Sequence, residues 1–128
     1  MRKKVTGIGG IFFKTKNPDA TKNWYAQHLG LDVNAYGSTF WWKDQQGNDC
    51  LTQWSPFKNN TDYFEPSKQS FMINYRVENL SELVSQLRAS GVKLIGEIQE
   101  FDYGKFAWVM DPDGHKIELW EAVDDKLK

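Results

Sequence analysis

The chain has 128 residues, with 16 basic and 17 acidic side chains and a formal net charge of -1. This length allows one well-buried domain, or two small modules that share a core, and it excludes two independent domains. The near balance of charge removes the electrostatic reason to propose nucleic acid or an anionic membrane as a partner.

The first half of the chain reads as a strand, a helix and three short strands. We predict a strand over residues 6–14 and then a helix that begins after Asn17-Pro18 and ends at Gly30, because apolar residues recur at helical spacing between these two signals. Glycines and polar turn residues then separate three short strands, which we predict over residues 31–36, 39–43 and 49–54.

The second half repeats this order after a polar connector over residues 56–69. We predict a strand over 71–77 and a helix over 81–90 that Gly91 closes. Three more strands are predicted over residues 92–99, 106–110 and 116–121.

The turn residues show the duplication most clearly. Asp44-x-x-Gly47 in the first half corresponds to Asp111-x-x-Gly114 in the second, and each helix begins at an Asn. We therefore predict an α+β fold in which two βαβββ modules, at about 5–55 and 70–122, form one domain over residues 1–128. Neither module can bury both faces of its sheet alone, so the two would pack side by side and enclose a cleft.

The most informative segment is Asp-Pro-Asp-Gly-His-Lys-Ile-Glu-Leu-Trp at residues 111–120, a tight turn followed by an alternating strand. It places Glu118 on the opposite face from Ile117 and Leu119. The segment closely resembles the last strand of the vicinal oxygen chelate superfamily, which contains glyoxalase I, extradiol dioxygenases and bleomycin resistance proteins. The resemblance spans nearly the whole chain, and it implies the same curved-sheet cleft.

Alternation along the strands predicts which side chains face this cleft. Ile73, Tyr75 and Val77 should pack on a helix, as should Ile117 and Leu119. Strand alternation and the correspondence of the two turns place the following residues in the cleft, where they would form a ligand-binding surface, with Trp42 and Trp108 as flanking members: Phe12, Leu51, Gln53, Met72, Asn74, Arg76, Glu118 and Trp120.

The resemblance also implies where a metal would bind, because enzymes of this superfamily hold a divalent ion with His, Gln or Glu on four strands. The first three of these positions fall on Gly10, Leu51 and Met72, and only Glu118 is a suitable ligand. A register shift of one residue would exchange Leu51 for Cys50. A single carboxylate does not hold such an ion against water, so we expect no metal and no other cofactor.

Two interpretations of the charged pair in the cleft remain open. Arg76 and Glu118 could neutralise each other in a salt bridge across the cleft floor. Alternatively, Arg76 would recognise an anionic group and Glu118 a cationic one, or Glu118 would act as a catalytic base.

These observations predict a metal-independent protein that binds a small aromatic or cationic molecule. The alternatives are a lyase or isomerase that uses Glu118, with or without a divalent metal, and an interaction module whose own aromatic residues close the cleft.

Six Trp, eight Phe and five Tyr exceed the needs of one small domain, so we also expect a homodimer. Neither an apolar membrane-spanning run nor a secretory signal is apparent, and Cys50 is the only cysteine, so we expect a cytoplasmic protein.

Overall fold

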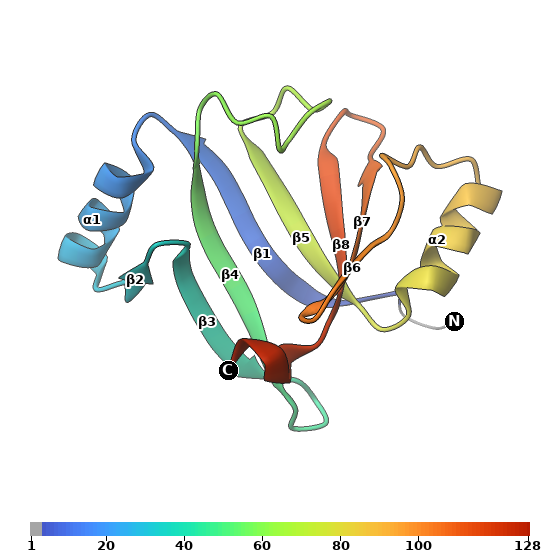
Figure 1. Ribbon diagram of the computed structural model, residues 1–128, viewed down its shortest axis with the longest axis horizontal. Coiled ribbons are helices and arrows are strands. Elements are labelled where there is room, and N and C mark those ends of the chain that lie inside the picture. Colours follow the sequence, from blue (N-terminus) through green and yellow to red (C-terminus); the bar gives the residue numbers. More distant parts are fainter. Residues whose placement is uncertain (1–3) are drawn as a thin grey trace.

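A computed structural model describes residues 4–128, in which eight strands form one curved sheet with a helix at each end (Figure 1). The strands lie in the order β2-β3-β4-β1-β5-β8-β7-β6. In chain order the elements are β1 (Val5–Thr15), α1 (Pro18–Leu29), β2 (Val33–Asn34), β3 (Gly37–Lys43), β4 (Asp49–Lys58), β5 (Phe71–Val77), α2 (Leu80–Ala89), β6 (Gln99–Phe101), β7 (Gly104–Met110), β8 (Lys116–Ala122) and the 3-10 turn η1 (Asp124–Leu127).

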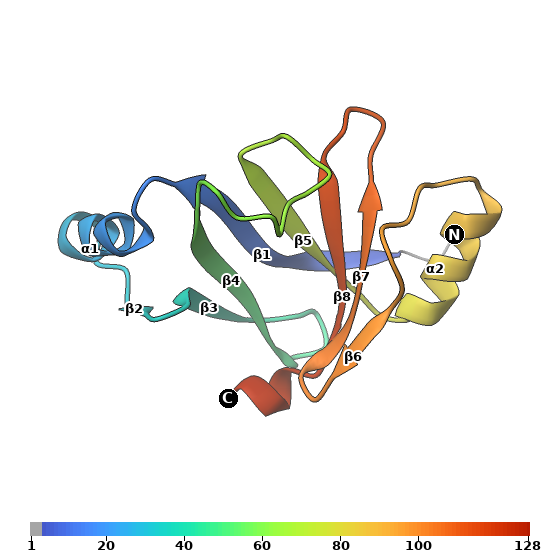
Figure 2. The same cartoon turned by 45° about the horizontal axis from the view of Figure 1, so that its top comes forward.

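Each half of the chain contributes four neighbouring strands. β1 pairs in parallel with β4, and β5 pairs in parallel with β8, while the antiparallel pair β1–β5 joins the two halves. The helices lie outside the curved sheet, so its concave side is left open between the connector that follows β4 and the C-terminal turn (Figures 1 and 2). The predicted α+β class with two βαβββ modules is confirmed.

Asparagine caps begin both helices, as the sequence indicated. The side chain of Asn17 accepts a hydrogen bond from the Ala20 N–H at 3.1 Å, and Asn79 accepts one from Glu82 N–H at 3.2 Å. Helix α1 ends at Gly30, whose φ of 72° is the left-handed conformation that glycine adopts without strain. Within residues 4–128, no helix has the length and apolar character needed to cross a bilayer.

The helix-facing side of the second module holds its main apolar core. The assignment of faces by alternation is confirmed here, because Val77 and Leu119 are buried in this core and Tyr75 and Ile117 pack against it. The fully buried members of this cluster are Val77, Leu80, Leu83, Val84, Ala107, Val109 and Leu119. The opposite side chains of β5 and β8 are therefore directed toward the concave side.

Two of the predicted strands are much shorter than expected. β2 ends at Asn34, because the Asn34 side chain accepts hydrogen bonds from the N–H groups of Tyr36 and Gly37 and so forms a tight turn. Over residues 92–98 the predicted strand is reduced to an isolated bridge between Leu94 and Val109, and only Gln99 belongs to a regular strand, β6. Gly96, at φ 72°, then turns the chain before β6 begins.

Candidate functional site

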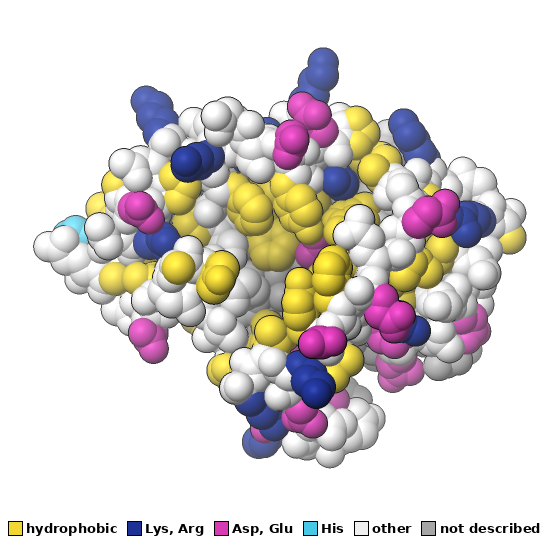
Figure 3. Space-filling model, viewed as in Figure 1, with side chains coloured by type: hydrophobic (Ala, Val, Ile, Leu, Met, Phe, Trp, Pro, Cys, Tyr) yellow, Lys and Arg dark blue, Asp and Glu magenta, His cyan; other side chains and the backbone are white. Residues whose placement is uncertain are grey.

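A cavity of about 690 Å³, which we call the main cavity, opens on the concave side of the sheet. In Figure 3 hydrophobic side chains surround a hollow at the centre of this side. The cavity is lined by Gly9, Phe12, Asn34, Tyr36, Thr39, Leu51, Gln53, Ser55, Phe57, Tyr63, Asn74, Tyr103, Phe106, Glu118, Trp120 and Leu127. Its size and its mostly apolar lining, with a few polar groups, are typical of small-molecule sites.

The structure brings six of the ten predicted site residues together in this lining. They come from four adjacent strands of both modules: Phe12, Leu51, Gln53, Asn74, Glu118 and Trp120. The register explains the grouping, because Gly10 lies opposite both Gln53 and Asn74, and Asn74 lies opposite Glu118. Gln53, Asn74 and Glu118 therefore form a row of polar side chains across the cavity floor.

The other four predicted residues lie outside this cavity. Met72 is fully buried, in an apolar cluster with Phe12, Phe64 and Trp108. Trp108 also lines a smaller adjoining pocket. Trp42 and Arg76 line a separate polar pocket of about 1080 Å³, between the turn that joins β3 to β4 and the C-terminal turn.

Glu118 is the most constrained polar group of the site. It is only 2 % exposed, and its carboxylate accepts hydrogen bonds from the Asn74 amide at 2.6 Å, the Trp108 indole at 2.9 Å and the Tyr63 hydroxyl. None of the ion pairs found within residues 4–128 includes it. Neutral dipoles thus stabilise a buried negative charge that no contacting cation neutralises.

Tyr63 is the site residue that sequence reasoning missed most clearly. It belongs to the connector between β4 and β5, which we had interpreted only as a polar linker, and it reaches Glu118 across 55 positions of sequence. Burial and the adjacent carboxylate raise the pKa of Tyr63, so its hydroxyl stays protonated and donates. The pair Tyr63-Phe64 within a polar stretch was the one available signal, because aromatic residues in a loop need a surface to pack on.

Aromatic rings form much of the cavity wall. The rings of Trp120 and Phe106 are stacked, with centroids 5.7 Å apart and an interplanar angle of 8°. The Trp120 indole N–H donates to the Tyr103 carbonyl at 3.1 Å and so fixes the ring. Seven lining residues are aromatic, of which only Phe12 and Trp120 were predicted: Phe12, Tyr36, Phe57, Tyr63, Tyr103, Phe106 and Trp120.

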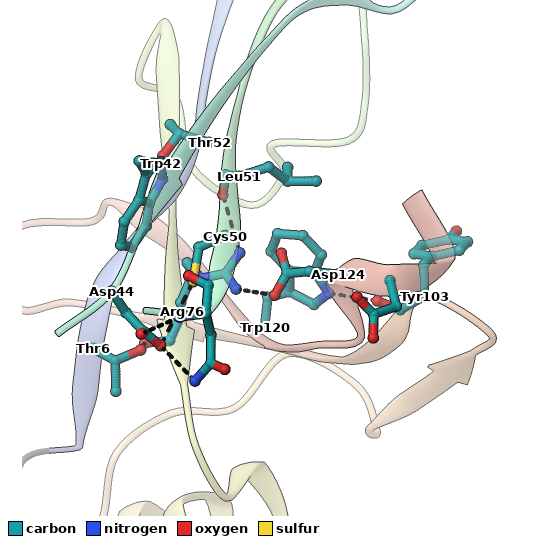
Figure 4. A network of polar contacts seen from close by, with 12 residues as sticks. Thr6, Trp42, Asp44, Cys50, Leu51, Thr52, Arg76, Tyr103, Trp120 and Asp124 are labelled. Atoms are coloured by element: carbon teal, nitrogen blue, oxygen red, sulfur yellow. Dashed lines mark hydrogen bonds and ion pairs between the residues drawn. The ribbon is translucent and has the colours of Figure 1, made fainter. Parts of the chain in front are cut away.

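Arg76 does not pair with Glu118, which answers one of the two open interpretations of the charged residues. Its guanidinium forms an ion pair with Asp124 and donates to the Leu51 carbonyl at 3.0 Å. It lies between the rings of Trp42 and Trp120, 5.6 and 5.0 Å from their centroids (Figure 4). Arg76 therefore fastens the C-terminal turn to both modules.

A glycine in β1 explains how these side chains fit over the centre of the sheet. A Cβ atom at Gly9 would overlap the amide oxygen of Asn74 and would lie 2.9 Å from the Trp120 ring. Because every other residue has a Cβ, only glycine permits this close approach. Gly9 thus allows the side chains of Asn74 and Trp120 to pack directly against the backbone of β1.

The side chains at the four metal-ligand positions do not fit a divalent ion. Gly10 has no side chain, Leu51 has no donor atom, and the Met72 thioether is sealed in an apolar cluster. The oxygens of Glu118 already accept three hydrogen bonds. In the described part of the chain, no group of three or more His, Cys, Asp or Glu side chains could hold a metal.

Comparisons with solved structures show which proteins share this fold. Methylmalonyl-CoA epimerase from Mycobacterium tuberculosis aligns with a TM-score of 0.67 at 18% identity, over 99% of this chain and 95% of the epimerase. The Streptomyces coelicolor epimerase in complex with 2-nitronate-propionyl-CoA aligns with a TM-score of 0.69 at 14% identity, over 93% and 99% of the two chains. A catechol 2,3-dioxygenase aligns at 0.66 and 20% identity, over 94% of this chain and 41% of the dioxygenase.

Sequence comparisons assign the family. No curated protein matches the chain significantly. The family model described as "Glyoxalase/Bleomycin resistance protein/Dioxygenase superfamily" matches residues 7–119, which is most of the chain. The chain therefore belongs to the glyoxalase/bleomycin resistance protein/dioxygenase superfamily.

Proposed function

We propose that this protein binds a planar aromatic cation in the main cavity and does so without a metal. One observation carries the proposal: a buried carboxylate with no contacting cation forms part of a cavity of about 690 Å³ that seven aromatic residues also line. Aromatic faces attract a planar cation by stacking and by cation-π interaction, worth about 0.5 to 2 kcal/mol for each ring.

The negative charge of Glu118 makes the electrostatic potential in the cavity favourable for a cation. A carboxylate removed from water acts at a low effective dielectric constant, so its attraction for a cation is stronger than at the surface. The side-chain oxygen of Asn74 is buried and has no hydrogen-bond partner, which adds a second acceptor near Glu118. A planar cation in the cavity would place its positive charge near both of these oxygens.

The same contacts favour binding over base catalysis by Glu118. A general base needs a lone pair directed at the proton that it removes. Three of the roughly four lone-pair sites of this carboxylate already accept hydrogen bonds from Tyr63, Asn74 and Trp108. A rigid, occupied carboxylate suits a counter-ion for a bound cation, and sequestration requires only affinity.

Titration with two matched probes tests this proposal. 1-Methylquinolinium and its neutral isostere 1-methylnaphthalene have nearly the same shape and differ in charge. We expect both to quench tryptophan emission, since Trp120 lines the cavity, and we expect the cation to bind at least about tenfold more tightly. The proposal would be contradicted if the two probes bound with equal affinity, or if neither probe quenched the tryptophan emission.

Metal independence makes a separate prediction. Protein purified without chelator should contain no stoichiometric transition metal, because Gly10, Leu51 and Met72 offer no suitable ligands. Treatment with EDTA should leave the melting temperature unchanged, since no bound ion stabilises the folded state. Elemental analysis that finds about one Zn, Ni, Mn or Fe per chain would refute this prediction.

We also propose a homodimer, on the basis of exposed apolar side chains on the convex side of the sheet. Ile8, Ile11, Phe40 and Phe71 are all more than a third exposed and lie on β1, β3 and β5. Exposed apolar patches usually mark interfaces, and symmetric dimers are the commonest assemblies. Light scattering at micromolar concentration should give about twice 14.9 kDa, whereas a mass near 14.9 kDa would argue against the dimer.

A further inference from the structure

A smaller pocket of about 460 Å³ adjoins the main cavity. Tyr63, Tyr103 and Phe106 line both spaces and form the boundary between them. The remaining residues of the smaller pocket are Asp62, Gln99, Phe101, Trp108 and Lys116. The function proposed for the main cavity does not involve this smaller pocket.

Lys116 is a buried cation with an incomplete set of partners. It is 8 % exposed, and its ammonium donates one hydrogen bond, to the Tyr63 carbonyl at 2.7 Å. An ammonium group carries three donors, and among residues 4–128 it forms no ion pair. Burial removes water from this ammonium and lowers the pKa of Lys116.

Two aromatic side chains lie between this cation and Glu118. The Lys116 ammonium is 5.4 Å from the Tyr63 ring centroid and 5.8 Å from that of Trp108. The polar hydrogens of the same two side chains bind Glu118. Tyr63 and Trp108 therefore hold two opposite charges apart, so that Glu118 lines the main cavity and Lys116 lines the smaller pocket.

The outer wall of the smaller pocket suits a flat ring. Phe101 and Tyr103, at the turn between β6 and β7, are stacked with centroids 5.3 Å apart and an interplanar angle of 3°. They are 45 and 39 % exposed, so part of each ring is accessible to a ligand. Asp62 also lines this pocket, but it is exposed, and water screens its charge more than that of the buried Lys116.

From this arrangement we propose that the smaller pocket binds a planar aromatic group that carries an anionic substituent, with Lys116 as its counter-ion. The anion would accept hydrogen bonds from the N–H groups of the Lys116 ammonium that have no partner. The ring would stack against Phe101 and Tyr103. This subsite has its own ligand and its own charge, and its existence does not require that the main cavity bind a cation.

A pair of fluorescent probes tests the subsite. 1-Anilinonaphthalene-8-sulfonate is an aromatic anion, and N-phenyl-1-naphthylamine is the same ring system without the sulfonate. Lys116→Met removes the charge and keeps a side chain of similar length. We expect it to weaken binding of the anion at least about tenfold and binding of the neutral probe less than about twofold. Lys105→Met is the matched control, because strand alternation directs this lysine of β7 to the opposite face of the sheet.

The proposal would be overturned if Lys116→Met lowered the affinity for both probes equally, or if it left the affinity for the anion unchanged. Because Lys116 also holds the connector through the Tyr63 carbonyl, a second variant covers the case in which Lys116→Met fails to fold. Phe101→Ala removes an exposed ring that lines only the smaller pocket, and it should weaken the anion severalfold without changing binding of 1-methylquinolinium. If Phe101→Ala leaves the anion's affinity unchanged, the anion binds elsewhere and the subsite is refuted.

Discussion

Glu118→Gln should weaken the binding of planar cations by about 1.4 to 2.8 kcal/mol, or roughly 10- to 100-fold, and should leave the binding of the neutral isostere almost unaffected. The variant removes a full negative charge at nearly constant shape from a side chain that is 2 % exposed. Titration of tryptophan fluorescence with 1-methylquinolinium and 1-methylnaphthalene measures the difference directly.

The hydrogen bonds around this position allow the substitution without loss of the fold. The amide oxygen of a Gln at 118 would accept the hydrogen bonds of Tyr63 and Trp108 in place of one carboxylate oxygen. Its NH₂ group would meet the side chain of Asn74, whose own oxygen has no partner, and rotation of that side chain by half a turn would supply an acceptor. A loss of affinity for the cation would then result from the loss of the negative charge, with little contribution from unfolding.

The control for this experiment is Glu100→Gln, which removes the same charge from an exposed position on β6. We expect it to change the affinity for the cation by less than about 0.5 kcal/mol, because water and salt screen an exposed charge. If Glu118→Gln weakens both probes equally, or Glu100→Gln weakens the cation as much, then Glu118 has only a structural role.

Trp120→Ala should lower the free energy of unfolding by about 3 to 5 kcal/mol, which is a large part of the stability of a small domain. The Trp120 ring is 4 % exposed, stacks on Phe106 and lies 5.0 Å from the Arg76 guanidinium. Its removal would leave a void beneath the cavity wall and would free the Tyr103 carbonyl of its hydrogen bond.

Urea denaturation measures this loss, and Trp24→Ala is the matched control. Trp24 is about half exposed on α1, so its removal should cost less than about 1 kcal/mol. Under conditions where Trp120→Ala remains folded, it should also bind aromatic probes about 1 to 3 kcal/mol more weakly. A variant as stable as the Trp24→Ala protein would show that Trp120 does not support the cavity wall.

Much of the fold could be predicted from the sequence, because it depends on local signals. Alternation is a property of each strand, so it correctly assigned Tyr75 and Leu119 to the helix side and Glu118 to the concave side. Asparagine caps and glycine stops depend on a few neighbouring residues, and they correctly located both helices. The repeated order of these signals was sufficient to predict two βαβββ modules and one cleft.

The composition of the site depended on contacts between distant parts of the chain. Tyr63 meets Glu118 across 55 positions and Arg76 meets Asp124 across 48, and no local pattern specifies such pairs. The curvature of the sheet and the path of the connector decide which side chains on the concave face share a space. Alternation therefore determined from the sequence that Glu118 faces inward, whereas only the tertiary structure decided that Arg76 would fasten the C-terminal turn and that Tyr63 would cover the carboxylate.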